Sequence, residues 1–257
     1  LIESFQFRRD STLAEVAAPL KKRGALPSRF AKRVMRLAMA ASAQRNDVFR
    51  IVANLIMPWE LLFAYLLERT KSDLATILPE WLEALQVLEA GSSLATFAEL
   101  NPDYTFPQFA KSDAHSGILS CVEMGHPLLA REECVVNDFK IDGLQHLDLV
   151  TGSNMSGKST FLRTVGINLA LANSGGPVHA QAMHVTPLRM YTCIRVADSV
   201  NDGISFFYAE VRRLKKMLSE LEAESSFPLL YFIDEVFRGT NNRERLIGSR
   251  ELLQQMS

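Results

Sequence analysis

The sequence has little cysteine, and the few thiols are far apart. Among 257 residues there are three cysteines, at Cys121, Cys134 and Cys193. An odd number of widely spaced thiols argues against a disulfide framework and against a zinc site. The composition therefore favours a reducing compartment, and we expect a cytoplasmic location.

Long apolar runs are also lacking. The most apolar stretch, residues 51–67, contains Asn54, Pro58 and Glu60. It falls short of the roughly 20 apolar residues that span a bilayer, and a pair of buried helices broken at Pro58 explains it. The sequence begins with Leu1, shows no signal-peptide pattern, and ends at Ser257 after a run with helical periodicity. We therefore interpret it as a piece of a longer protein.

The net charge is only −1, but the charged residues are unevenly distributed along the chain. Residues 1–50 hold 11 Lys and Arg against 4 Asp and Glu, whereas the remainder holds 17 against 25. The basic excess includes a stripe at helical spacing, formed by Arg29, Lys32, Arg33 and Arg36. This stripe fits a solvated helix face, contact with nucleic-acid phosphates, or contact with anionic lipid.

The expected secondary structure divides the chain in two. Residues 1–100 show helical periodicity, with interruptions expected at Pro58, Pro79 and Gly91. After Asn101, short strands alternate with helices. The strands are expected at 118–124, 134–141, 147–151, 188–196 and 229–233, and the main helices at 158–173 and 205–222. This order predicts an α/β P-loop NTPase domain over residues 101–257, preceded by an all-α helical region over residues 1–100.

A glycine-rich segment fits the pattern G-x-x-x-x-G-K-[ST]. It consists of Gly152, Ser153, Asn154, Met155, Ser156, Gly157, Lys158 and Ser159. The glycines let the backbone curl so that amide groups point at phosphate oxygens, and the next helix directs its positive end there. Lys158 adds a charge for the β- and γ-phosphates, and the Ser159 hydroxyl can bind Mg²⁺. The segment predicts an ATP site.

An acidic pair follows the apolar run 229–233. A P-loop ATPase needs an acid at the end of a buried strand to hold Mg²⁺, and Asp234 has that position. Glu235 comes next and can orient or deprotonate a water molecule. We therefore predict that Glu235 and Lys158 are catalytic, and that Ser159 and Asp234 bind the metal. Glu235 favours hydrolysis by water over simple binding, and together with the helix start at Ser205 it argues against a small-molecule kinase.

The residues around these motifs resemble the ATPase domain of the MutS family. The string 151–160, with Asn-Met between its glycines, is similar to the family's phosphate loop. Residues 234–240 resemble its acidic strand end and the Arg-Gly-Thr turn that follows. Residues 205–210 look like its Ser-Thr-Phe-x-x-Glu helix start, and residues 125–128 and 136–138 resemble the stretch before the loop.

The resemblance implies a dimer with two composite ATP sites. Ser205 would reach the γ-phosphate bound by the other subunit, Asn137 would lie near the adenine, and Thr160 would join the loop at the phosphates. A homodimer and duplex DNA are the implied partners, with ATP and Mg²⁺ as cofactors. The sequence departs from mismatch-repair members at Phe237, where a glycine is usual, and at Cys134, where an aromatic residue is expected.

The helical half resembles a narrower group. Residues 54–60, 67–69, 81–85 and 101–104 look like a shorter bacterial branch of MutS-like proteins, whose members carry membrane helices upstream. Two processes therefore stay open. One is DNA-linked work of the mismatch-repair type by a dimeric clamp. The other is a membrane-associated ATP switch, anchored upstream of Leu1, that acts on a protein partner.

Overall fold

The chain forms two compact units, Leu1–Ser93 and Leu94–Ser257. The computed structural model describes residues 11–22, 24–43, 55, 58–110, 118–144, 146–153, 155–194, 206–237 and 240–256. Each unit has its own buried cluster of side chains. The domain division that we expect after residue 100 stays a prediction.

Three helices make up the described part of the first unit: α1 (Ser11–Lys21), α2 (Pro27–Ala43) and the first part of α4 (Trp59–Leu100). The apolar faces of these helices meet around Trp81, whose ring lies edge-on to Phe30 at 5.4 Å between centroids. On the same side of α2, Arg33 donates to Asp73 of α4 at 3.0 Å. One member of the basic stripe is thus paired within the unit.

Helix α4 differs from the sequence prediction. It begins directly after Pro58, as predicted, but it then runs for 42 residues without the breaks expected at Pro79 and Gly91. Buried contacts of Trp81 and Ala84 support the backbone just after the proline. Past Gly91, the helix continues to Leu100, and the hydroxyl of Ser93 donates to the carbonyl of Glu89 at 2.9 Å. At Pro79, tertiary packing therefore outweighs the local helix-breaking preference.

Two sheets form the second unit. The larger has the order β1-β4-β2-β3, with strands β1 (Gln108–Phe109), β2 (Leu119–Met124), β3 (Asn137–Ile141) and β4 (Ala182–Val185). Strand β2 is antiparallel to both neighbours, and β1 is parallel to β4. The smaller sheet joins β5 (Arg189–Cys193) and β6 (Leu229–Ile233) in parallel.

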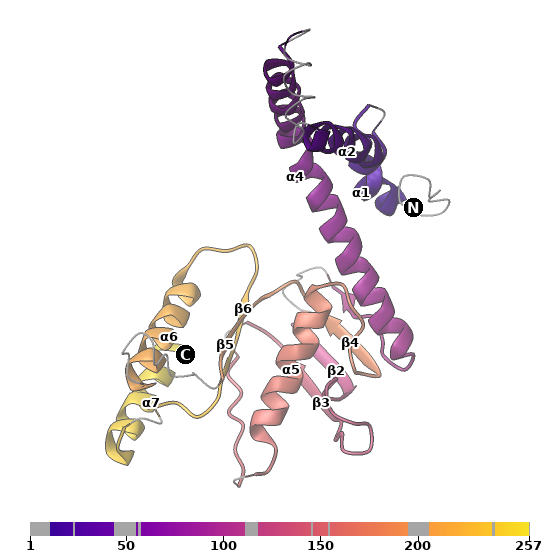
Figure 1. Ribbon diagram of the computed structural model, residues 1–257. Helices are drawn as coiled ribbons and strands as arrows, with labels where there is room; N and C mark the ends of the chain where they lie inside the picture. Colours follow the sequence, from indigo (N-terminus) through magenta and orange to yellow (C-terminus); the bar gives the residue numbers. More distant parts are fainter. Residues whose placement is uncertain are drawn as a thin grey trace. The chain divides into compact units, whose positions relative to one another are not determined.

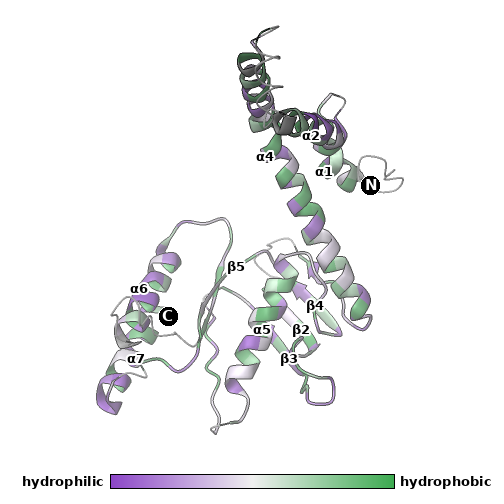
Figure 2. Ribbon diagram, viewed as in Figure 1, coloured by the Kyte–Doolittle hydropathy of each residue, from purple (hydrophilic) through white to green (hydrophobic). Residues whose placement is uncertain are grey.

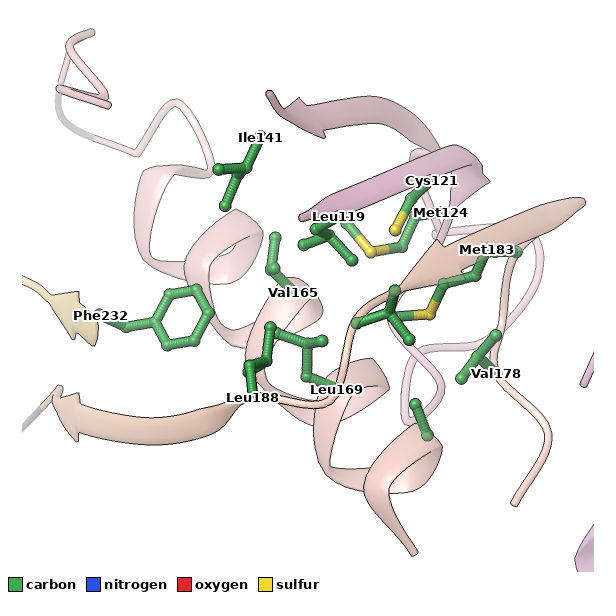
Figure 3. Close-up of a cluster of buried hydrophobic side chains, with 13 residues drawn as sticks. Leu119, Cys121, Met124, Ile141, Val165, Leu169, Val178, Met183, Leu188 and Phe232 are labelled. Atoms are coloured by element: carbon green, nitrogen blue, oxygen red, sulfur yellow. The ribbon is translucent and has the colours of Figure 1, made fainter. Parts of the chain in front are cut away.

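Helix α5 (Lys158–Asn173) supplies the centre of the second unit's core. Its residues Val165 and Leu169 pack against Leu119, Met124 and other buried side chains of the larger sheet. Figure 3 shows Phe232 of β6 pointing toward Val165 from the other direction. One helix therefore packs against side chains from both sheets.

Helices α6 (Phe206–Glu222) and α7 (Asn242–Met256) lie on the opposite side of β5 and β6 from α5 (Figure 1). Their buried residues Leu214, Met217 and Leu252 form a separate cluster with Cys193. Figure 2 shows more hydrophilic residues along α6 and α7 than along α5. This agrees with two amphipathic helices that each bury only one face.

The predicted fold class is wrong in two respects, and the fold is a mixed α/β arrangement. Residues 147–151 do not form the strand expected before the glycine-rich loop, so the all-parallel sheet in the described residues has only the strands β5 and β6, and the larger sheet is mixed. The helices also do not end as a separate all-α region ahead of a P-loop domain. Helix α4 continues from the first compact unit into the second.

Among the residues that the structure describes, no helix is both long and apolar enough to cross a membrane.

Candidate phosphate-loop site

The glycine-rich segment forms a tight curl in front of α5. Gly157 has a φ of 88° and Met155 a φ of 63°, so both lie in the left-handed region, which glycine enters most easily. A Cβ atom on Gly152 would come within 2.8 Å of the Ser156 hydroxyl. The loop therefore closes tightly on itself, and a side chain at 152 would require the Ser156 hydroxyl to move.

Lys158 folds back over this curl. Its ammonium group donates to the carbonyl of Gly152 at 3.0 Å and to that of Ser153 at 2.6 Å. Gly157 occupies the N-cap position of α5, and no side chain caps the helix there. A cation and the uncapped amides at the start of a helix thus meet at one place, which is the electrostatic setting that binds anions.

The acidic pair lies beside this cation. Lys158, Asp234 and Glu235 all line one cavity of about 350 Å³. The rest of its wall comes from residues 147–150, from Leu162 of α5, from the end of β6, from Val236 and from α7. The structure therefore brings the loop lysine and both acids together, although 76 positions separate Lys158 from Asp234 in the sequence.

Two cationic and three acidic side chains line the cavity. The cations are Lys158 and Arg245, and the carboxylates are Asp148, Asp234 and Glu235. Tyr231 lies among them, and burial raises the pKa of its hydroxyl group, so it stays neutral near pH 7. Charge at the cavity wall therefore comes from these five groups.

The acids stand on a strained turn. The amide of Asp234 donates to the carbonyl of Cys193 at 3.2 Å, which extends the β5–β6 ladder by one bond. Glu235 has a φ of 50° and Phe237 a φ of 59°, unusual values for residues with a Cβ atom. The amide of Phe237 donates to the carboxylate of Glu210 at 2.6 Å. The chain thus turns sharply at the point where the two acids face the cavity.

The donor set fits a hard cation that is bound mainly through its substrate. Mg²⁺ takes oxygen ligands and keeps few protein contacts, so one hydroxyl and one carboxylate are a reasonable set. Ser159 and Asp234 offer these groups, although Ser159 is not among the residues lining the cavity. Within the described residues, no group of three or more His, Cys, Asp or Glu side chains is suited to hold a metal ion by itself.

Other expected site residues lie apart from the cavity or outside the described residues. Asn154 and Ser205 are outside them, so the structure does not place these side chains. Asn137 begins β3, is exposed, and donates to the carbonyl of Val135 at 3.4 Å. Thr160 lies in the first turn of α5 and is exposed.

Sequence reasoning did not place two residues beside the acids, Arg245 and Glu210, although Glu210 belongs to the helix start 205–210 that resembles a MutS motif. Arg245 of α7 lines the cavity, but nothing in its sequence context sets it apart from other surface arginines. Glu210 carried a signal that was available. It falls four residues before Leu214 and seven before Met217, on the apolar face of α6, where an acid is unexpected.

The described residues form a mixed α/β fold in which a glycine-rich loop and an acidic turn share one cavity. Residues 148–253 match the family model of MutS domain V, and these residues include the glycine-rich loop, the acidic turn and α7. The match covers only this part of the chain, which agrees with the incomplete P-loop fold described above.

Individual relatives give the same result. The chain is 32% identical over 213 residues to DNA mismatch repair protein MutS 1 of Halobacterium salinarum, covering 81% of this chain and 23% of that protein. It is 32% identical over 164 residues to DNA mismatch repair protein MutS of Chlorobium phaeovibrioides, covering 62% and 18%. Endonuclease MutS2 of Thermus thermophilus is 35% identical over 130 residues, covering 50% and 17%.

These matches support membership of the MutS family for this chain. The chain spans less than a quarter of the length of each of these three relatives. None of their names points to the shorter branch with membrane helices.

Proposed function

We propose that this chain binds MgATP at the loop of residues 152–160 and hydrolyses it with water, as part of a MutS-like protein. The observation that carries the proposal is the shared cavity of Lys158, Asp234 and Glu235. A cation for phosphate oxygens, an acid for magnesium and an acid for water are the three charges that this reaction needs.

We assign each residue a role from its chemistry and from its position in the loop or the acidic turn. Lys158 exchanges its two carbonyl contacts for β- and γ-phosphate oxygens, a change that moves only its flexible side chain. The amides of residues 152–157 and the start of α5 contact the phosphates. Ser159 and Asp234 hold Mg²⁺, which supplies positive charge at the phosphate oxygens. Glu235 orients the attacking water and accepts its proton.

A substitution at Lys158 tests this proposal. We expect Lys158→Ala to weaken MgATP binding by at least about 100-fold, because it removes a charge-assisted contact to the phosphates. Isothermal titration calorimetry measures the binding. Lys140→Ala is the matched control, because Lys140 is exposed and its ion pair is with Asp142 at 2.5 Å. Unchanged binding in Lys158→Ala, or no MgATP uptake by the folded wild type, would overturn the proposal.

The proposed assembly is a homodimer whose two ATP sites close as a clamp, with Ser205 and α6 of one copy at the nucleotide of the other. The start of a helix favours anionic groups, which supports a phosphate as its ligand. Analytical ultracentrifugation with and without MgATP tests this step. An ATP-dependent shift from monomer to dimer is expected, and an unchanged monomer would contradict it.

We propose duplex DNA as the macromolecular partner. Support comes from the names of two relatives and from Arg29, Lys32 and Arg36, which remain outside the ion pair that holds Arg33. Binding to a DNA duplex should fall steeply as salt rises, because contacts with phosphates release counterions. Salt-dependent binding to anionic vesicles, with none to DNA, would instead favour the membrane-associated switch.

A further inference from the structure

One buried acid in the second unit is not explained by packing. Glu210 is 4% exposed and lies on the apolar face of α6. Its Oε1 atom accepts the hydrogen bond from the amide of Phe237, but its Oε2 atom has no hydrogen-bond partner among the described residues. Burying an acceptor without a partner is unfavourable, so an apolar side chain would suit this position better if packing were its only role.

The contact of Glu210 falls on the most strained part of the site. Phe237 closes the turn that carries Asp234 and Glu235, and both Glu235 and Phe237 have positive φ. Such conformations persist only where surrounding contacts hold them. The amide of Phe237 is fixed by Glu210, and its ring lies against α7, where a Cβ on Gly248 would come within 3.0 Å of it.

We propose that Glu210 is a positioning residue that holds the turn 235–237, and with it the carboxylate of Glu235, in place at the cavity. Glu210 is not among the residues that line the cavity. It acts through the backbone of Phe237, two residues after Glu235. This inference rests on the proposed function, because it assigns Glu235 a reaction to perform.

The proposal also connects two parts of the site. Helix α6 begins at Phe206, so Glu210 is the fifth residue of that helix. A movement of the first turns of α6 is passed to the acidic turn through this hydrogen bond, alongside the packing of Val236 and Phe237 in the cluster of Leu214 and Met217. In the other direction, a change at Glu235 alters the support of α6.

Two substitutions with side chains of similar size distinguish a positioning role of Glu210 from a packing role. Glu210→Met fills the buried space but cannot accept a hydrogen bond, whereas Glu210→Gln keeps an oxygen acceptor. We expect kcat for ATP hydrolysis to fall about 100-fold in Glu210→Met, which is the effect of a misplaced reacting group. The dissociation constant for MgATP should change by less than about threefold, because the phosphate loop is untouched. Glu210→Gln should recover most of the lost turnover.

Hydrogen exchange of the Phe237 amide gives a readout that needs no activity. Protection of this amide should be lost in Glu210→Met and kept in Glu210→Gln. The matched control is Glu220→Ala on the same helix. This substitution removes the contact of Glu220 with Arg189 at 3.0 Å and should lower the melting temperature without changing kcat or the Phe237 amide.

The outcomes can be told apart from a failure of the proposed function. Three results would each overturn the positioning role. The first is a wild-type kcat in Glu210→Met, and the second is an equal loss of kcat in Glu210→Met and Glu210→Gln. The third is unchanged hydrogen exchange of the Phe237 amide in Glu210→Met. A wild-type protein that takes up no MgATP would end the proposed function instead. The exchange measurement would then still decide whether Glu210 holds the turn.

Discussion

The larger sheet with α5 and the β5–β6 edge with α6 and α7 belong to one compact unit, but they are built differently. Around α5, Leu119, Met124 and Leu169 are completely buried, and the buried amide of Asn168 makes three hydrogen bonds. The region of the larger sheet also has Glu123 at positive φ and one buried nitrogen of His179 without a partner, whereas the β5–β6 edge combines a cavity of about 350 Å³ with two residues at positive φ and a buried carboxylate oxygen without a partner.

The packed region around α5 supports the site, whereas the β5–β6 edge carries the acids of the proposed reaction. Close packing gives a region one stable arrangement, whereas cavities, strain and unpaired polar atoms reduce stability and persist where they serve a site. Helix α5 joins the two regions, because its first residue is Lys158 at the cavity while Val165 and Leu169 lie in the core. The packed region therefore fixes the lysine against which the strained turn must be placed.

The largest expected effect is on turnover at the strained edge. Glu235→Gln should lower kcat about 1,000-fold, because it removes the general base, while MgATP binding and the melting temperature stay close to wild type. Phosphate release measures the rate, and calorimetry measures the binding. Glu251→Gln, an exposed acid on α7, is the control and should have wild-type turnover. Normal hydrolysis by Glu235→Gln would remove Glu235 from the mechanism.

Matched leucine truncations compare the packing of the two regions directly. Leu169→Ala should lower the free energy of unfolding by about 4 kcal/mol and Leu252→Ala by about 2 kcal/mol. Leu169 is fully enclosed, whereas Leu252 borders the cavity and so has fewer neighbours to lose. Urea unfolding followed by circular dichroism gives both values. Equal losses would show that the β5–β6 edge is packed as tightly as the core.

A third prediction concerns the buried polar groups. Asn168 donates to the carbonyls of Gly125 and Thr164, both at 2.9 Å, and accepts from the amide of His179 at 2.8 Å. Asn168→Leu keeps the volume but leaves these groups unpaired, so the free energy of unfolding should fall by about 2 kcal/mol. Urea unfolding measures this loss.

Glu210→Met is the comparison for the Asn168 variant, because it also removes a partner of one backbone amide but relieves an unpaired oxygen. Its loss of stability should be smaller. A larger loss at Glu210 than at Asn168 would mean that the carboxylate is chiefly structural.

Much of this arrangement follows from short stretches of sequence. The prediction for α5 is confirmed at both ends, because Gly157 starts the helix and the glycine pair after Ser174 stops it. The apolar run of β6 likewise predicts its exact bounds. In both cases the signal lies within the element itself.

The failures have non-local causes. Residues 147–151 have strand-like composition, but they form no ladder in the described structure, and Asp148 instead pairs with His146 at 3.1 Å. Strand formation depends on a partner that the sequence does not name. The positive φ of Phe237 and its contact with Glu210 also depend on α6 and α7, which lie far away in the sequence. Position 237 thus has a backbone conformation that glycine adopts easily, and a glycine is usual at this position in the mismatch-repair proteins that the sequence resembles.

The smallest expected effect is a pH dependence from the well-packed side of the unit. Burial lowers the pKa of His126, with further contributions from the charges of Arg163 and His179. Its Nδ1 atom accepts a hydrogen bond from the amide of Leu128 at 3.2 Å, a contact that requires this nitrogen to be unprotonated. The folded state therefore favours the neutral ring.

Because the pKa of His126 is lower in the folded state than its unfolded value of 6.5, the unfolded chain takes up the proton first as the pH falls. The stabilisation is fully present above pH 6.5 and is lost as the pH falls through the folded pKa. Melting temperatures from pH 7.5 to pH 5 should therefore fall more steeply in wild type than in His126→Asn, whose side chain keeps an acceptor but does not titrate. The difference should be small, because this ring is partly open to solvent. Parallel curves for the two proteins would remove His126 as a source of the acid sensitivity.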